Sequence, residues 1–498
     1  MTLQPADTPN SEAPQAQQAD PQQADPQQAG HLKANAIGVP GAIAMSIAIM
    51  APAAGMMFVP QVVAGSAGAA VPLVYLISLI GSLFVANTIV QFARRVPHAG
   101  SFFAYNAAGL GRTVGFLSGW LLFAGYFVFY PQNILACSYF ISTVLERRLG
   151  LHITWVVFAI LIVVLIWYLS TRGISNSMKT DLYFVTVEVL VILAVCAVIF
   201  LKGGAEGFTT KVFTPVASPT GWGGIFFGMI FGMMTFMGFE AAATVAEETA
   251  NPRRNIPRAV WGAVIGIGIF YVIVTYALSI GYGVDHGKDF AQATTLPMDF
   301  LATRYAGSGL AVAVDVAGII SAFAVSLALN NAAVRVIFAM GRDGVLPKQL
   351  GKVNTKRLTP STAINLVGIA ALVLALIVGL ASDPYPDGYG YFGAFGTLPI
   401  LLLYAIASIS LIRYVKTKEP KTFNWWKHGL APAIGAVIML LPIYGSIFPI
   451  PAWPYNLILG LVAIFIVAGI FVGVALRRKS SHVMERVAHI MATGGDQQ

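Results

Sequence analysis

Long apolar runs separated by short polar segments make up the sequence from about residue 33 onward. Each run is about 20 residues long or longer, which is the length that an α-helix needs to cross the hydrocarbon core of a bilayer. The pattern predicts an all-α integral membrane protein with twelve transmembrane helices. The predicted spans are residues 36–64, 68–92, 111–145, 153–171, 180–201, 222–248, 259–283, 308–339, 361–381, 390–412, 430–448 and 454–476.

The two ends of the chain are polar. Residues 1–32 are mainly Gln, Pro, Ala and Asp, and they hold too little apolar surface to form a core, so they are predicted to be a disordered tail. The tail has no basic start followed by an apolar stretch, so no cleavable signal peptide is expected. Residues 33–480 are predicted to form the twelve-helix domain, and 481–498 a second tail.

The composition excludes an ordinary soluble protein, because 57% of the residues are hydrophobic and only 10% are charged. Lys and Arg number 30 against 21 Asp and Glu. Most of these basic residues fall on one side of the predicted membrane, which places both termini in the cytoplasm and the protein in the cytoplasmic membrane. The excess of positive charge therefore reflects topology and contact with membrane lipid, and no binding of nucleic acid is expected. Cys137 and Cys196 lie in apolar runs and are expected to be packing residues.

Two predicted spans are interrupted. Pro52 and Gly55 break the first span, and Gly238 and Glu240 break the sixth. Since these spans are five apart, the second set of five spans crosses the membrane in the opposite sense to the first. The pattern predicts an inverted repeat over residues 36–201 and 222–412, followed by extra helices at 430–476.

A broken helix exposes backbone groups that can bind a charged solute. The N–H groups after the first break suit a carboxylate, and the carbonyls before the second break suit an ammonium group. Pro52 has no N–H, so the next three residues are the expected donors. The residues expected to line this substrate site are Met50, Ala51, Ala53, Ala54, Gly55, Tyr126, Thr235, Phe236, Met237, Gly238 and Glu240. Gly125 precedes Tyr126, so the third span offers no carboxylate there, which favours a neutral amino acid or a small amine.

Three motifs resemble those of the amino acid, polyamine and organocation permease superfamily, whose members have the LeuT-like fold. They are RRVPHAGSFFAYNAAGLG at 94–111, GFEAAATVAEETANPRRNIPRAV at 238–260 and RVIFAMGRDGVLPKQL at 335–350. The resemblance implies import or exchange of amino acids or related amines, coupled to protons or to a second solute. Many relatives have G-S-G or a similar run at the first break, where this chain has Ala51 to Gly55, so substrate assignments that rest on that run do not transfer.

Two acids, Glu188 and Glu240, lie toward the middle of predicted spans, where a charge is costly. For Glu240 the alternatives are substrate-linked gating or proton sensing, and capping of the second half-helix. Glu188 aligns with a position at which several proton-coupled relatives have a lysine. It is expected to carry a proton or to bind sodium with Ser321 and Ser326, unless it is a neutral acid with one hydrogen bond.

Charged residues that follow the sixth span and end the eighth are predicted to form a cytoplasmic network that opens and closes with the inner gate. They include Glu247, Arg253, Arg335, Arg342 and Asp343. A simple positive-inside role is the alternative for the arginines.

These features favour a secondary active transporter that works by alternating access and is coupled to protons. An exchanger, a sensor of the same fold and a channel stay open as alternatives. The sequence has no HExxH, P-loop, CxxC or nucleophile-elbow motif, so no enzymatic activity, cofactor or metal is expected.

Overall fold

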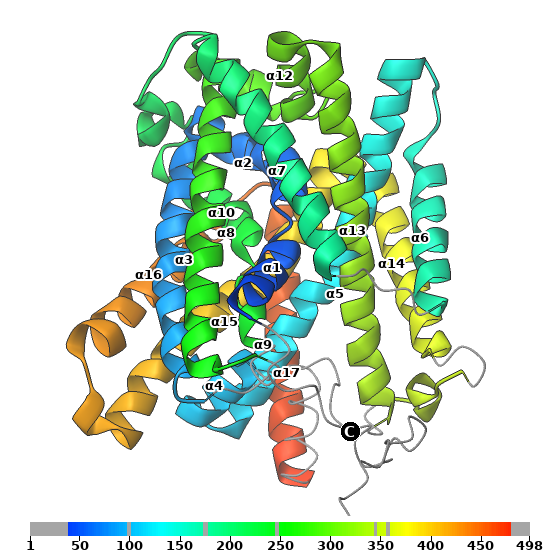
Figure 1. The fold of residues 1–498 in the computed structure, drawn as a ribbon. Helices are drawn as coiled ribbons and strands as arrows, with labels where there is room; N and C mark the ends of the chain where they lie inside the picture. The colour runs from blue at the N-terminus through cyan, green and yellow to red at the C-terminus, as the bar shows by residue number, and fades with distance from the viewer. Residues whose placement is uncertain are drawn as a thin grey trace, which may run out of the picture.

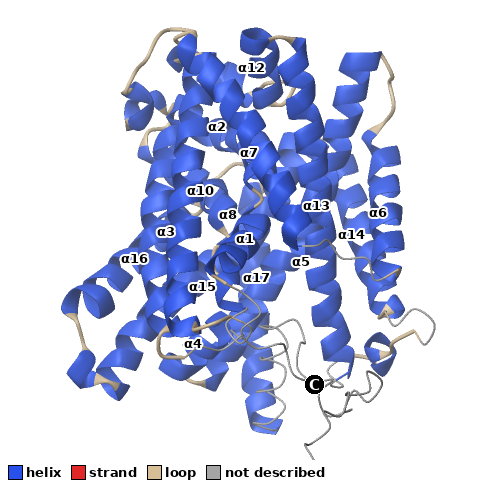
Figure 2. Cartoon of the chain, in the orientation of Figure 1, coloured by secondary structure: helices blue, strands red, loops and turns tan. Residues whose placement is uncertain are grey.

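The computed structural model describes residues 38–96, 101–172, 178–244, 249–342, 346–354 and 359–479. These residues form a bundle of helices, and no β-strand occurs among them (Figures 1 and 2). The predicted all-α class is confirmed for this part of the chain. The predicted tails, 1–32 and 481–498, lie outside the described residues.

The long helices account for most of the bundle, and shorter ones join them. The long helices are α1 (Val39–Met50), α2 (Pro52–Ala67), α3 (Val71–Ala93), α5 (Arg112–Leu149), α6 (Trp155–Thr171), α7 (Met178–Leu201), α8 (Trp222–Phe236), α10 (Pro252–Tyr282), α13 (Ser308–Arg342), α14 (Ser361–Ala381), α15 (Tyr389–Lys418), α16 (Ala431–Gly445) and α17 (Tyr455–Lys479). The shorter helices are α4 (Ser101–Leu110), α9 (Ala241–Thr244), α11 (Gly287–Ala291) and α12 (Pro297–Ala306).

Every predicted span overlaps one of these helices or a pair of them. Among the described residues, ten helical segments are long and apolar enough to cross a membrane. The first of these segments, Val39–Ala93, contains α1, α2 and α3, and α6 is a shorter apolar helix of 17 residues. A bundle of many apolar helices is therefore confirmed, and the number of twelve crossings stays a prediction.

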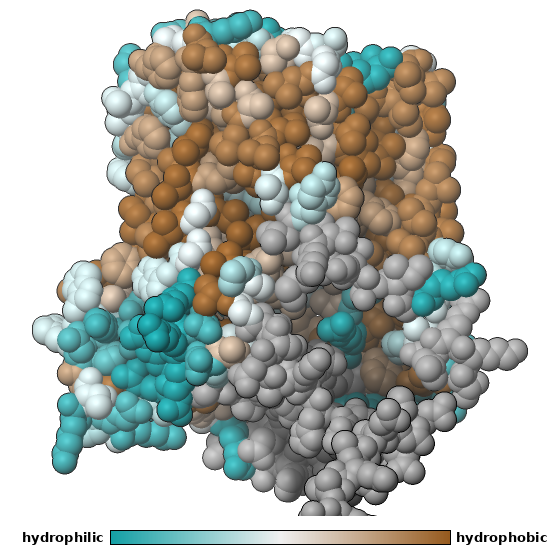
Figure 3. All heavy atoms as spheres, viewed as in Figure 1, coloured by the Kyte–Doolittle hydropathy of each residue, from teal (hydrophilic) through white to brown (hydrophobic). Residues whose placement is uncertain are grey.

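The outer surface of the bundle is hydrophobic. Figure 3 shows a broad hydrophobic band above a hydrophilic region at the lower left. On α6, for example, Leu161 is 56% exposed and Leu165 is 47% exposed. Apolar surface on this scale is unfavourable in water and is expected to contact lipid.

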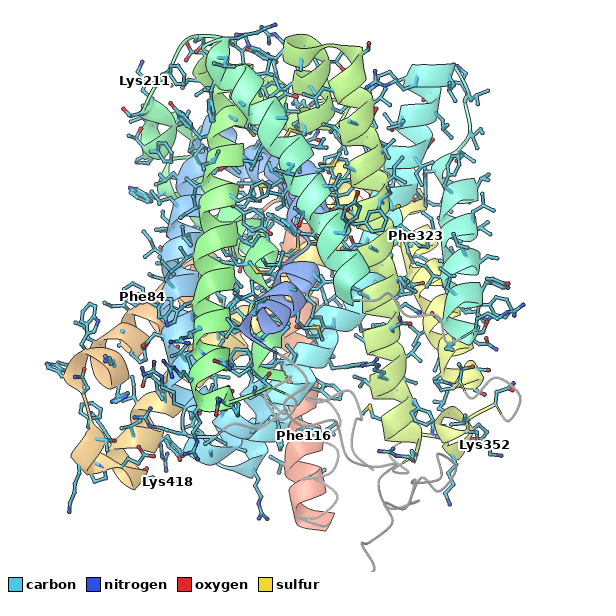
Figure 4. All side chains as sticks on the ribbon, in the orientation of Figure 1. Phe84, Phe116, Lys211, Phe323, Lys352 and Lys418 are labelled. Carbon is cyan, nitrogen blue, oxygen red and sulfur yellow. The ribbon has the colours of Figure 1, made fainter. Side chains whose placement is uncertain are left out.

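Basic residues lie at both ends of the bundle. The lower end in Figure 1 is where α3 ends and α10 begins, and the upper end is where α5 ends and α13 begins. Figure 4 shows Lys352 and Lys418 at the lower end and Lys211 at the upper end. In the predicted order of spans, Lys352 and Lys418 fall in loops on one side of the membrane and Lys211 in a loop on the other side.

The first predicted span is broken at Ala51, as its small residues and Pro52 indicate. Ala51 has left-handed backbone angles of φ 44° and ψ 65°, and it ends α1 and precedes α2. Pro52 suits the first position of α2, where its missing N–H leaves no hydrogen bond unmade. A non-glycine residue with positive φ is uncommon, so the surrounding contacts hold this break in place.

The sixth predicted span is broken as well. Helix α8 ends at Phe236, Met237 has extended backbone angles, and α9 begins at Ala241. Gly238 has φ +105°, which favours glycine, and a Cβ atom there would lie 2.5 Å from Cγ2 of Ile49 on α1. The second break therefore lies directly against the first, and glycine is needed both for its backbone angle and for this close approach.

Candidate functional site

The carbonyl ends of the two broken helices meet at one tyrosine of α10. The hydroxyl of Tyr271 lies 3.1 Å from the carbonyl oxygen of Met50 and 3.0 Å from that of Thr235. Tyr271 is fully buried and makes an edge-on ring contact with Phe236. A buried carbonyl without a partner is costly, so this hydroxyl stabilises both breaks. The sequence analysis missed Tyr271, although a phenol within an apolar span needs a polar partner and could have drawn attention to it.

A serine of α1 joins the first broken helix to the second. Ser46 donates a hydrogen bond to the carbonyl of Phe239 at 2.9 Å and accepts one from the N–H of Ala242 at 3.0 Å. The second contact satisfies an N–H in the first turn of α9, which is the role of a helix cap. The two breaks are thus tied together by Ser46 of α1 and Tyr271 of α10.

Glu240 lies at the second break and accepts hydrogen bonds from three groups. Tyr126 of α5 donates to Oε1 at 3.2 Å, and Tyr404 of α15 donates to Oε2 at 3.0 Å. The N–H of Gly238 also donates to Oε2, at 3.0 Å. A helix cap accepts from an N–H two or three residues later in the chain, whereas Gly238 precedes Glu240. The carboxylate, only 3% exposed as a residue, thus connects α5, the second break and α15.

A cavity lies beside both breaks. Of the expected site residues, Met50, Ala51, Ala54, Gly55, Tyr126, Thr235 and Met237 line it, and Ala53, Phe236, Gly238 and Glu240 do not. The lining residues that the sequence analysis did not single out are Ile49, Val59, Phe129, Gln132, Asn133, Met234, Val325, Leu329 and Tyr389. The lining side chains are uncharged, and most are apolar.

The cavity is small in this conformation. Its volume is about 80 Å³, and ligand pockets for small molecules are typically about 300–1,000 Å³. The two cavity-lining N–H groups expected to bind a carboxylate already have acceptors. Gly55 donates to the carbonyl of Ala51 at 2.9 Å, and Ala54 donates to the hydroxyl of Ser321 at 3.2 Å. A solute of amino-acid size therefore fits only after the cavity widens.

Ser321 of α13 also connects the first break to Glu188 of α7. Its hydroxyl is hydrogen-bonded to the Glu188 carboxyl group and accepts from the N–H of Ala54. Glu188 is 4% exposed. Ser326 is likewise buried, but its hydroxyl donates to the carbonyl of Ala322 in its own helix at 2.8 Å. The contacts therefore join Ser321, rather than Ser326, to the acid.

A group of charges at the upper end, built on two buried aspartates, was not among the predicted site residues. Arg148 at the end of α5 contacts Asp299 of α12 at 3.0 Å and Asp315 of α13 at 2.9 Å. Arg147 pairs with the same two carboxylates. Nearby, Gln61 of α2 donates to the carbonyls of Ala291 and Ala293. These contacts hold α12 and the segment before it over the upper end of α2. The two adjacent arginines that follow the third predicted span were the feature of the sequence that could have indicated this group.

The predicted network at the lower end is described only in part. Arg253 lies in the first turn of α10, and Arg335 and Arg342 lie in the last three turns of α13. Glu247 and Asp343 lie outside the described residues. Whether these five residues act together stays a prediction.

An apolar bundle with two broken helices beside a small cavity is typical of a membrane transport protein. The sequence profile of the amino acid permease family matches residues 37–490. The chain belongs to this family, and the resemblance drawn from the three motifs is confirmed. It is a multi-pass membrane protein.

Several characterised transporters are similar to the chain over most of its length. The branched-chain amino acid permease BcaP of Bacillus subtilis (strain 168) is 27% identical over 395 residues, which are 76% of this chain and 80% of the relative. The low-affinity putrescine importer PlaP of Escherichia coli (strain K12) is 26% identical over 388 residues, or 76% of this chain and 81% of the relative. The methylthioribose transporter of Bacillus subtilis (strain 168) is 26% identical, over 69% of this chain and 75% of the relative.

Proposed function

We propose that this permease is a secondary active transporter that carries a neutral amino acid or a small amine across the cytoplasmic membrane by alternating access. The observation that carries the proposal is the pair of broken helices whose ends meet beside one small cavity. In this proposal residues 36–201 and 222–412 are the two inverted repeats of a twelve-span LeuT-like fold, and both termini lie in the cytoplasm.

The lining of the cavity favours a neutral solute with an apolar side chain. Ile49, Met234, Val325 and Leu329 present apolar side chains, and the lining carries no charged one. A second ammonium group on the solute would lack a carboxylate in direct contact, because no carboxylate of the described residues lines the cavity. Glu240, which is hydrogen-bonded to the lining residue Tyr126, already accepts three hydrogen bonds. A relative named as a branched-chain amino acid permease is consistent with this choice.

Binding would exchange protein hydrogen bonds for solute hydrogen bonds. A substrate carboxylate would take the N–H groups of Ala54 and Gly55, and its ammonium group would take the carbonyls of Met50 and Thr235 that now face Tyr271. Because each group already has a partner, binding and widening of the cavity are coupled. A transport cycle needs such coupling, since a ligand shifts a conformational equilibrium only through different affinities for its states.

Glu240 would close the side of the cavity toward the lower end. Tyr126 both lines the cavity and donates to Glu240, and Tyr404 binds the same carboxylate from α15. Separation of α5 from α15 breaks at least one of these hydrogen bonds. Opening toward the cytoplasm would therefore require this contact between α5, α15 and the second break to part.

Glu188 would couple the cycle to protons. Its carboxyl group is joined through Ser321 to the N–H of Ala54, a lining residue at the first break. A change in the proton on Glu188 changes the hydrogen bond of Ser321, and Ser321 contacts the break directly. Protonation and solute binding would thereby favour the same conformation.

Uptake into proteoliposomes tests the proposal. The purified protein is reconstituted without sodium, and labelled leucine, alanine, arginine and putrescine are offered with and without an inward proton gradient. We expect leucine to accumulate and the accumulation to collapse with a protonophore. Uptake that occurs only into vesicles preloaded with solute would identify an exchanger instead, and saturable binding without any uptake would identify a sensor.

A further inference from the structure

Arginines line a hollow at the lower end of the bundle, away from the central cavity. One lies just after α3, and three lie in the first two turns of α10. The hollow has a volume of about 570 Å³. It is lined by Arg94, Arg253, Arg254, Pro257, Arg258 and Trp261.

Among the residues that the structure describes, no carboxylate pairs with any of these four arginines, and all four are exposed. Their neighbour Arg95 differs, because its guanidinium binds Glu419 at 2.9 Å. The positive end of the dipole of α10 adds to the charge of the hollow. Guanidinium groups match phosphate oxygens with two parallel hydrogen bonds, so the hollow suits a phosphate group.

The face of α10 beyond the arginines is apolar and exposed. Trp261 is half-buried at the edge of the hollow, and one isoleucine follows on each of the next three turns. Ile265 is 44% exposed, Ile269 is 52% exposed and Ile273 is 38% exposed. Figure 3 shows the corresponding change from a hydrophilic region at the lower left to the hydrophobic band above it.

We propose that this hollow binds the phosphodiester headgroup of an anionic phospholipid, whose acyl chains lie along the isoleucines of α10. Basic hollows at membrane depth bind acidic headgroups, and a tryptophan at the same level suits the interface. The apolar face decides for a lipid over a free phosphate, which would gain nothing from the three isoleucines. The positive-inside rule alone does not explain why four arginines gather around one hollow, because basic residues scattered over the same side of the membrane would satisfy that rule equally well.

Native mass spectrometry of the purified full-length protein tests the site. Phosphatidylglycerol and phosphatidylcholine with the same acyl chains are titrated against wild type and against the double variant Arg254→Gln/Arg258→Gln. One arginine near an anionic surface contributes about fivefold to affinity, so the variant should bind phosphatidylglycerol about thirtyfold more weakly. Phosphatidylcholine should bind both proteins weakly and equally.

The matched control is Arg413→Gln/Lys421→Gln, which removes the same charge from exposed positions at the same end but outside the hollow. It should leave the affinity for phosphatidylglycerol within about twofold of wild type. Equal losses in both double variants would overturn the proposal, because the effect would then come from net charge alone. Glycerol 3-phosphate that competes as well as the intact lipid would also overturn it and would assign the hollow to a soluble anion.

A third variant keeps the test valid if the glutamine variant does not fold. Arg254→Lys/Arg258→Lys retains both charges but loses the paired hydrogen bonds to phosphate. We expect a smaller but measurable loss of affinity for phosphatidylglycerol. Unchanged affinity in this variant, together with an unfolded glutamine variant, would contradict specific recognition of the phosphodiester.

Discussion

The two buried acids at the centre of the molecule, Glu240 and Glu188, are held in different ways. Glu240 accepts hydrogen bonds from Tyr126, Tyr404 and the N–H of Gly238. Glu188 has a hydrogen bond to Ser321. An ionised carboxylate can accept about four hydrogen bonds, so the first acid is nearly saturated by the protein and the second is not.

This difference shows that burial alone does not assign a role to an acid within a membrane. A carboxylate surrounded by donors from three segments is a fixed brace, and its loss frees those segments. A buried carboxylate with few hydrogen-bond donors is stabilised most by protonation, because the proton removes a charge that the protein solvates poorly. This difference supports the proposal that Glu240 closes the cavity and that Glu188 couples transport to protons.

The largest effect is expected for Glu240→Gln. The glutamine cannot accept from both tyrosines in the same geometry, and hydrogen bonds to a charged group contribute about 1.5–3 kcal/mol each. Uptake in proteoliposomes should fall about thirtyfold or more at every pH. The matched variant Tyr404→Phe removes one donor outside the cavity lining and should reduce the maximal rate with little change in KM. A rate near that of wild type for Glu240→Gln would contradict the role of a brace.

Glu188→Gln should abolish coupling without abolishing transport. The glutamine keeps the size of the side chain and cannot release a proton. Wild type coupled to one proton accumulates solute about tenfold per unit of pH gradient, because one pH unit equals about 1.36 kcal/mol. The variant should only equilibrate its solute. The ratio of internal to external leucine at a fixed gradient measures this, and an unchanged ratio would remove Glu188 from the coupling mechanism.

Ser321→Ala should produce a partial loss of the same kind. It removes the hydroxyl between Ala54 and Glu188, and a neutral hydrogen bond contributes about 1 kcal/mol. We expect the gradient-driven accumulation to fall about fivefold. Ser326→Ala is the control, because that hydroxyl donates within its own helix, and it should behave like wild type. If both alanine variants behave alike, Ser321 has no special role.

The smallest effect is expected for an acid outside the membrane-spanning helices. Burial tends to raise the pKa of Glu419, but hydrogen bonds from Arg95 and Thr422 outweigh it and lower the pKa below the ordinary value of 4.5. The pair therefore stabilises the fold fully above pH 4.5, and the stabilisation is lost as the pH falls through the lowered pKa. Glu419→Gln should cost less than about 1 kcal/mol at pH 7, because the pair is partly exposed.

Thermal unfolding in detergent at pH 7 and at pH 4 measures this difference. The midpoints of wild type and Glu419→Gln should differ slightly at pH 7 and differ less at pH 4. A difference that grows as the pH falls would have the wrong sign for a carboxylate with a lowered pKa.

The sequence alone predicted the helices, the place of both breaks and the family. Apolar runs locate the helices because the preference of each residue for lipid over water can be read directly from the sequence. Pro52 locates the first break because proline has no backbone N–H, and Gly238 locates the second because glycine tolerates a positive φ. Both are properties of a single residue, so they can be read from the sequence. Glu188 and Glu240 were found because an acid in an apolar run is conspicuous.

Only the tertiary structure decided which groups satisfy the broken helices and the acids. Tyr271 reaches the carbonyls of both breaks from α10, and Ser46 caps α9 from α1. The expected donor Ala54 is occupied by Ser321, and Asp299 binds arginines more than a hundred residues earlier in the chain. A hydrogen-bond partner so distant in sequence leaves no local pattern, because it is chosen by how helices pack and not by what a segment prefers on its own.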